Sequence, residues 1–210
     1  MQKMSRRALA FMTFVTLPLH SAGKPQLASK VLGTDAKTYT ISRSYTTLSF
    51  TATKWMVFKE EGLFQDFNGT MTYSATDPTK CKIDVMVQAA SLDTRNASRD
   101  KVLRSDDFFD VEKFPTLSFR STKVIANGND SYQVQGDLTI HGVTKSINVP
   151  VKMIGARVMP GIGDFAGFET TFTIDRRDFG VFGNRWSGNT LAIDPTIAIH
   201  LLIGGVRDMK

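Results

Sequence analysis

Few residues of this chain have the type and spacing that catalysis or metal binding requires. Apart from His20, the histidines are His141 and His200, and neither has a spacing typical of a metal site. The sequence contains no HExxH, CxxC or G-x-S-x-G motif and no phosphate-binding loop. His141 stands before Gly142 and favours a turn, and His200 falls on the polar side of a predicted strand. We therefore predict no metal and no cofactor.

Two groups of charged residues bring carboxylates close together. Asp106, Asp107 and Asp110 have the chemistry for general acid–base catalysis. Their position between a predicted helix end and a turn fits capping and surface solvation better. Residues 175–178, Asp-Arg-Arg-Asp, are likewise interpreted as a turn of ion-paired side chains. These residues favour a binding protein over an enzyme.

The N-terminal residues have the pattern of a secretory signal peptide. Lys3, Arg6 and Arg7 precede the apolar run 8–19, and small residues follow up to Gly23. Twelve helical residues span about 18 Å, less than the roughly 30 Å hydrocarbon core of a bilayer, which disfavours a membrane anchor. We expect residues 1–23 to be removed, residues 24–38 to form an irregular leader, and the mature protein to be periplasmic or secreted.

The charge pattern and the cysteine content exclude some kinds of binding partner and of covalent cross-link. Without the signal peptide the chain has 23 basic and 20 acidic residues, which are interleaved along the sequence. That pattern is typical of solvated surfaces and argues against nucleic-acid binding. Cys81 is the only cysteine, so no intramolecular disulfide can form.

From Tyr39 onward, apolar and polar residues alternate with a period of two, which predicts half-buried strands. Turn residues such as His141-Gly142 separate these runs, and Pro195 should mark a bulge in the last one. Eight or nine such strands predict one antiparallel barrel or sandwich. The predicted strands are residues 46–54, 69–75, 82–90, 116–125, 132–140, 145–153, 167–174 and 191–203.

One helix interrupts the strands. Arg95–Ser105 contains no glycine or proline, and Asp93 or Thr94 can serve as its N-cap. The helix leads into a segment with three phenylalanines among four carboxylates. Such a segment suits the mouth of an apolar chamber, with rings inside and carboxylates outside.

Three stretches, in this order, resemble the YceI-like family of secreted lipid-binding proteins: RDKVLRSDDFFDVEKFPTLSF (Arg99–Phe119), GDLTIHGVTK (Gly136–Lys145) and IDRRDFGV (Ile174–Val181). The resemblance covers Tyr39 to Gly204 and gives a barrel domain of residues 39–206. It implies an all-β, lipocalin-like antiparallel barrel of about eight strands, with one helix covering an end. The ligand it implies is a polyisoprenoid or a similar long-chain lipid.

We therefore expect an exported protein that sequesters or carries a long-chain isoprenoid or fatty-acyl lipid without covalent chemistry. Transient contact with a membrane surface and homodimer formation stay open. The expected ligand-binding residues are the apolar strand faces, the aromatic segment and candidate head-group or lid residues: Phe50, Arg104, Phe108, Phe109, Phe114, Phe119, Ile140, Val149, Phe172 and Trp186. Two alternatives are an enzyme acting on such a lipid and a structural or interaction module with a solid core.

Overall fold

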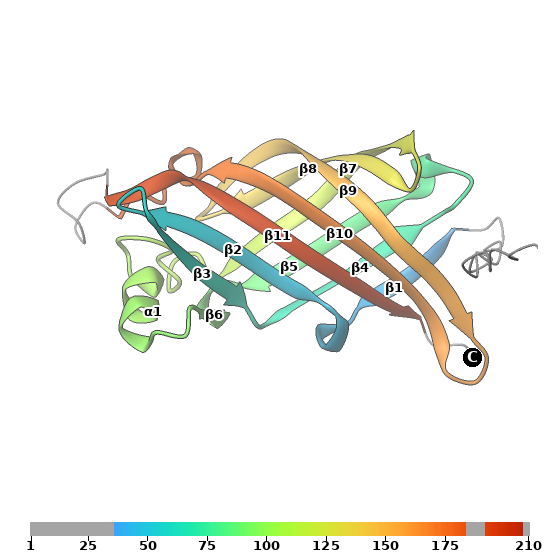
Figure 1. Cartoon of the computed structure of the whole chain (residues 1–210), viewed down its shortest axis with the longest axis horizontal. Coiled ribbons are helices and arrows are strands. Elements are labelled where there is room, and N and C mark those ends of the chain that lie inside the picture. Colours follow the sequence, from blue (N-terminus) through green and yellow to red (C-terminus); the bar gives the residue numbers. More distant parts are fainter. Residues whose placement is uncertain (1–35, 184–191, 208–210) are drawn as a thin grey trace, which may run out of the picture. The chain divides into compact units, whose positions relative to one another are not determined.

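The structure, a computed structural model, describes residues 36–183 and 192–207. Its strands form one antiparallel sheet that closes into a barrel, because β1 pairs with both β4 and β11 (Figure 1). The predicted signal peptide and most of the predicted leader lie outside the described residues. The strands are β1 (Lys37–Ile41), β2 (Thr47–Lys54), β3 (Phe58–Phe64), β4 (Phe67–Tyr73), β5 (Lys82–Gln88), β6 (Leu92–Asp93), β7 (Thr116–Gly128), β8 (Ser131–Ile140), β9 (Val143–Met159), β10 (Gly163–Asp175) and β11 (Ile193–Arg207).

Three pairs of short strands each form one pass of the barrel wall. β1 pairs with the end of β11, and β2 continues along the same edge of β11 after one turn of 3-10 helix, η1 (Arg43–Tyr45). β3 and β4 together form the next pass, because β3 pairs with β2 and β4 pairs with β1. β5 and β6 form the pass after that, since β5 pairs with β4 and β6 pairs with β3. With each of these pairs counted as one strand, the barrel wall has eight strands. Each strand is hydrogen-bonded to the next one along the chain. The predicted eight-stranded antiparallel barrel is confirmed.

Local turn chemistry accounts for two details of this wall. The hairpin between β8 and β9 turns at His141 and Gly142, whose φ angles are 50° and 74°. Positive φ at both positions is what a tight antiparallel hairpin requires. Near Pro195, the register of β11 against β2 shifts between Ile193 and Ile197. Both features were predicted from the residue types.

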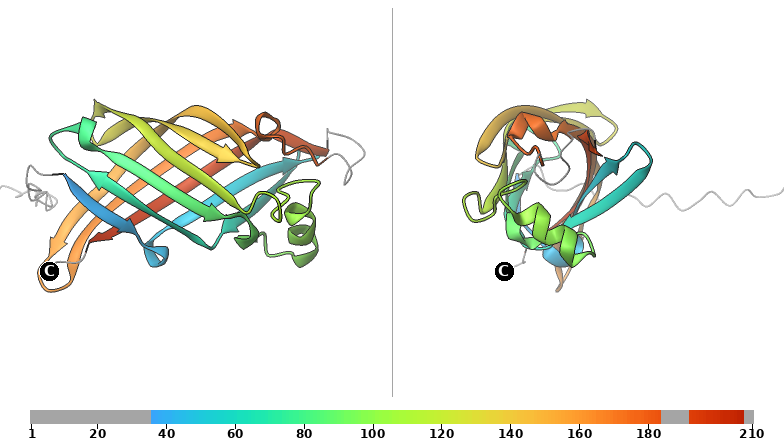
Figure 2. Two further views of the ribbon diagram at one scale, coloured as in Figure 1. Left: turned by 180° about the vertical axis from the view of Figure 1, so that it is seen from behind. Right: turned by 90° about the vertical axis from the view of Figure 1, so that its left-hand side faces the viewer.

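The helix α1 (Ala97–Arg104) lies across one end of the barrel (Figure 2). It begins later than predicted, because Asn96, and neither Asp93 nor Thr94, is the N-cap and accepts a hydrogen bond from the Arg99 main chain at 3.0 Å. Thr94 is buried and has a different partner: its main-chain N–H and its hydroxyl donate to the carboxylate of Asp100. This contact holds the start of the helix against the loop before it.

Buried side chains, among them Tyr39, Met71 and Tyr73, fill the opposite end of the barrel, where one buried carboxylate joins three strands. Asp164 accepts hydrogen bonds from Lys37 at 2.7 Å, Tyr39 at 3.2 Å and Arg207 at 2.9 Å. Burial opposes its ionisation, but the hydrogen bonds from Lys37 and Arg207 hold the pKa of Asp164 below its usual value. Burial and the neighbouring carboxylate raise the pKa of Tyr39, so its hydroxyl stays a donor. The ends of β1, β10 and β11 are thereby joined.

Replacing Asp164 with asparagine is expected to lower the free energy of unfolding by about 3–5 kcal/mol at pH 7, because Lys37 and Arg207 lose their buried partner. Because the folded-state pKa is depressed, the stability that the carboxylate contributes is present above its unfolded pKa of about 3.9 and is lost as the pH falls through the folded pKa. Urea unfolding of both proteins at pH 7 and pH 3 measures the difference, which should shrink in acid.

The matched control is Asp84→Asn, because Asp84 forms an exposed ion pair with Arg120 at 3.0 Å. Exposed pairs contribute little, so this variant should unfold almost as the wild type does. An equal stability gap between wild type and Asp164→Asn at both pH values would contradict the role of the charge.

Candidate functional site

An apolar cavity of about 590 Å³ occupies the barrel between the filled end and α1. This volume lies within the range of roughly 300–1,000 Å³ that small-molecule pockets occupy. Its wall consists of the inward-facing residues of successive strands, for example Ile83 and Val85 on β5 and Ile197 and Ile199 on β11. Alternation along each strand therefore places branched aliphatic side chains around one shared space.

The structure brings most of the predicted site residues to this cavity. The predicted residues that line it are Phe50, Phe108, Phe109, Phe119, Ile140, Val149 and Phe172. Arg104 and Phe114 are not among the lining residues, and Trp186 lies outside the described residues. Binding of a ligand by the lining residues stays a prediction.

Glycines on neighbouring strands leave room for two of the rings at the barrel wall. A Cβ atom at Gly136 would collide with the ring of Phe119, and one at Gly62 would collide with the ring of Phe50. Gly136 belongs to the stretch GDLTIHGVTK and faces the barrel interior, where a larger residue would displace the ring. Close approach of an aromatic ring therefore explains why glycine stands at these strand positions.

Phe108 and Phe109 close the cavity below α1. Phe108 is buried in a cluster with Ile140, Phe179 and Val181, and Phe109 packs against it. The ring of Phe109 also meets the ring of Phe64 edge to face, with centroids 5.9 Å apart. These rings join the segment after α1 to the barrel wall.

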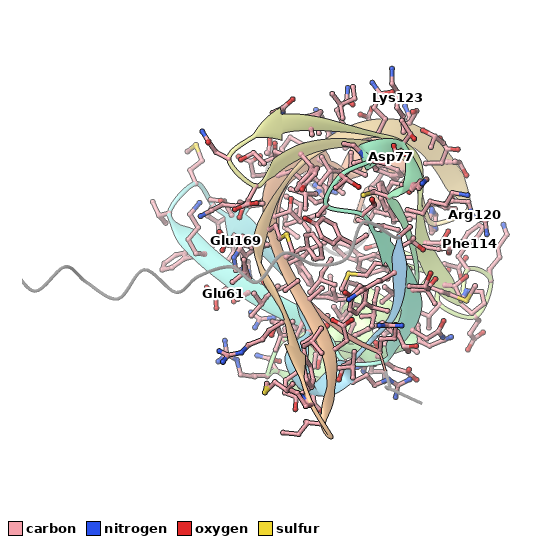
Figure 3. The ribbon with its side chains drawn as sticks, turned by 90° about the vertical axis from the view of Figure 1, so that its right-hand side faces the viewer. Glu61, Asp77, Phe114, Arg120, Lys123 and Glu169 are labelled. Atoms are coloured by element: carbon pink, nitrogen blue, oxygen red, sulfur yellow. The ribbon has the colours of Figure 1, made fainter. Side chains whose placement is uncertain are left out.

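Phe114, the third ring of that segment, packs on the outside. It lies at the outer edge of the wall, on the side of Arg120 (Figure 3). Its ring centroid is 4.4 Å from that of His141, and a Cβ atom at Gly142 would collide with it. Phe114 therefore covers the tight turn between β8 and β9, where the turn backbone leaves room for an aromatic ring.

Arg104 is held by the main chain. Its guanidinium donates to the carbonyl of Ala90 at 2.9 Å and to the carbonyl of Leu92. These bonds tie the end of α1 to the segment that enters β6. Arg99, on the preceding turn of the helix, does line the cavity.

The cavity reaches the surface between the β2–β3 hairpin and α1. We call this opening the mouth and define it by Lys54 and Glu60 from the hairpin and by the N-cap Asn96 with Ser98 and Arg99 of α1. Asn96 and Ser98 are exposed to solvent although they line the cavity. Arg99 forms an ion pair with Glu60, which links the helix to β3 across the opening. The mouth is thus polar while the interior is apolar.

Arg176 was predicted to be one of the ion-paired turn residues, but it is buried and donates to main-chain carbonyls. Its guanidinium donates to the carbonyls of Val181 at 2.7 Å, Phe182 at 2.5 Å, Ile193 at 2.9 Å and Asp194 at 3.4 Å. Burial lowers the pKa of Arg176 from its ordinary value. Arg176 is one of the lining residues of the cavity, and its guanidinium joins the segment after β10 to the start of β11.

The neighbour of Arg176 behaves as predicted. Arg177 pairs with Asp175 at 2.6 Å on the surface, so the ion-paired interpretation of this turn is confirmed for that pair. In the sequence the two arginines look alike. The signal that could separate them is alternation: Ile174 faces the cavity, and two residues further along the chain Arg176 does as well.

Two further observations concern other site types. Within residues 36–183 and 192–207, no three His, Cys, Asp or Glu side chains are grouped so that they could hold a metal ion. The helices of this part of the chain are all too short or too polar to cross a membrane.

The comparison with known protein families agrees with the geometry. The YceI-like domain family matches residues 39–203. This chain belongs to the YceI-like family. A UPF0312 protein of Pseudomonas aeruginosa is 45% identical over 120 residues, which cover 57% of this chain and 62% of the relative. The match thus spans less than two thirds of that protein.

Solved structures show the same fold. BcnA of Burkholderia cenocepacia superposes with a TM-score of 0.70 at 22% sequence identity. The superposition covers 78% of this YceI-like chain and 98% of the BcnA chain. A domain from Saccharophagus degradans, described as a polyisoprenoid binding domain, gives a TM-score of 0.64 at 15% identity, covering 81% and 98%. At these identities the likeness concerns the barrel alone.

Proposed function

We propose that this protein binds a long-chain isoprenoid or a similar apolar lipid in its barrel and carries it without covalent chemistry. The cavity of about 590 Å³ with an aliphatic and aromatic wall is the observation that supports this most directly. Each buried CH₂ group contributes about 0.8 kcal/mol, so an acyl or prenyl chain has ample driving force to enter. The structural neighbour described as a polyisoprenoid binding domain supports an isoprenoid as ligand.

The polar groups of the interior fit a binding role better than catalysis. The hydroxyl of Thr170 donates to the carbonyl of Pro150 at 2.6 Å, and Arg176 is engaged by main-chain carbonyls. Among the described residues, every buried side-chain nitrogen or oxygen has a hydrogen-bond partner. A solid-core module, the other alternative, does not fit a barrel that contains a cavity.

Export is part of the proposal. The basic and apolar N-terminal pattern supports cleavage after Gly23 and a periplasmic or secreted mature protein. A carrier of this kind must meet a membrane, at least transiently, to collect or release its lipid.

Native mass spectrometry of protein purified without detergent from its own host tests the proposal. We expect a bound lipid that is released on unfolding, on a chain that begins near Lys24. Protein that carries no lipid after isolation and takes up none from added isoprenoid would contradict the binding proposal. A chain beginning at Met1 in the cytoplasm would contradict export alone.

A pair of variants on β5 shows whether the lipid occupies the cavity. Val85 lines the cavity, and the next residue, Met86, is exposed on the outer face. Val85→Trp fills space that the ligand needs and should reduce lipid retention at least about tenfold. Met86→Trp places the same side chain outside and should retain lipid as the wild type does.

A further inference from the structure

The hairpin between β2 and β3 ends in four consecutive apolar residues that point away from the barrel. We call Trp55–Phe58 the hairpin tip. The exposed fractions of Trp55, Met56, Val57 and Phe58 are 57%, 89%, 71% and 56%. Side chains of this size are rarely left in water together unless they meet a partner. The hairpin projects at the end of the barrel where α1 lies (Figure 2).

The backbone of this turn is strained. Trp55 and Met56 have φ angles of 48° and 62°, in the left-handed region that favours glycine and asparagine. The amide of Val57 donates to the carbonyl of Lys54 at 3.2 Å and closes the turn. Asn-Gly would form this turn with less strain, so the two large apolar residues are not explained by turn formation. Strained positions of this kind often serve a function.

The charges around the tip favour a negatively charged surface. The Nζ of Lys54 lies 4.2 Å from the centre of the Trp55 ring, and Lys59 follows the tip on β3. The two carboxylates of β3 both face arginines: Glu60 pairs with Arg99, and Glu61 lies 3.6 Å from Arg95. An aromatic tip flanked by lysines is typical of protein segments that lie in the headgroup region of a bilayer.

The size of the tip argues against a protein partner. A stable protein–protein interface buries about 800 Å² and involves roughly 20–30 residues on each side. Four residues at the end of a two-stranded hairpin offer far less. Insertion into a bilayer interface needs no complementary surface, because the apolar side chains only have to reach the acyl boundary.

We propose that the hairpin tip docks the protein onto the surface of an anionic phospholipid bilayer, next to the cavity mouth. Lys54 belongs to the mouth and stands directly before Trp55, so a docked tip would bring the opening to the membrane. This proposal rests on the proposed carrier function, because docking would serve to collect or release the lipid. Docking can nevertheless be measured separately from lipid binding.

Vesicle flotation of the full chain purified from its own host tests the proposal. The probes are vesicles of phosphatidylcholine alone and of phosphatidylcholine with one quarter phosphatidylglycerol. Wild type should float with the anionic vesicles, and more weakly with the neutral ones. In the double variant Trp55→Asn/Met56→Gly, binding should fall at least about tenfold, because two apolar side chains are lost.

Unfolding would not explain a loss of vesicle binding in this variant. Asn-Gly suits two consecutive positive φ angles, so the double variant should be at least as stable as the wild type. The matched control is Ile162→Ser in the β9–β10 hairpin, which removes a side chain that is 70% exposed. Ile162 lies near the start of β10, which pairs with the end of β11, whereas the tip lies at the start of β11. The control should float as the wild type does.

Three results would overturn the proposal: vesicle binding by the double variant equal to wild type, no binding of wild type to either vesicle, or a wild-type dimer in vesicle-free solution that the double variant loses. The last would make a second copy the occupant of the tip. Lipid retained in the barrel is measured on the same samples. Its absence in wild type contradicts the carrier function, whereas loss of flotation with lipid retained contradicts only the docking.

Discussion

Phe172→Asp is expected to abolish lipid binding and to lower the free energy of unfolding by about 3–5 kcal/mol. Phe172 lies on β10 opposite Ile199 of β11, and both side chains line the cavity. A carboxylate at this position replaces a large apolar ring and faces apolar side chains that cannot solvate it. Denaturant unfolding and titration with a fluorescent isoprenoid analogue measure the two effects.

The neighbouring position gives the matched control. Thr171 is exposed on the opposite face of β10, so Thr171→Asp adds the same charge to the outer surface. It should bind lipid normally and lose little stability. Phe172→Leu keeps an apolar wall and should retain binding even if some packing is lost. A folded Phe172→Asp protein with wild-type affinity would show that lipid does not occupy the cavity.

Arg176→Ala is expected to destabilise the barrel by about 3–6 kcal/mol, since several main-chain carbonyls lose a donor and an unmade buried hydrogen bond costs about 1–3 kcal/mol. The carbonyls belong to Val181, Phe182, Ile193 and Asp194, on both sides of the cavity end. Arg176→Lys keeps the charge but loses the planar arrangement of donors, so it should recover only part of the stability. Thermal and urea unfolding provide the measurement.

The adjacent Arg177→Ala is the control for this prediction. Arg177 makes a surface ion pair with Asp175 and should leave the unfolding midpoint almost unchanged. If both alanine variants unfolded alike, the four main-chain contacts of Arg176 would not stabilise the fold as argued.

Strand faces and turns could be predicted from the sequence because both depend on local chemistry. Alternation placed Val149 and Ile199 on inward faces, and both line the cavity. The dipeptide His141-Gly142 and the position of Pro195 predicted a tight turn and a register shift. Together with the three stretches that resemble the YceI-like family, these patterns were sufficient for an eight-stranded barrel.

β3 was not predicted from the sequence, and the reason also lies in its local residue pattern. Its inward positions include Gly62, which leaves room for the ring of Phe50, and the polar Glu60, which lines the mouth. The period of two is therefore weak along this strand. The turn before it contains Trp55 and Met56, which are not turn-forming residues, so neither signal marked the hairpin.

By itself, the sequence determined which strand faces are apolar, where the chain turns and which family it belongs to. Only the tertiary structure decided that Phe108 lies under the helix while Phe114 covers a turn on the outside, and that Arg176 is buried while Arg177 is exposed. The reason is distance along the chain. The burial of Asp164 depends on Lys37, 127 residues away, and no local pattern records such a partner before the barrel closes.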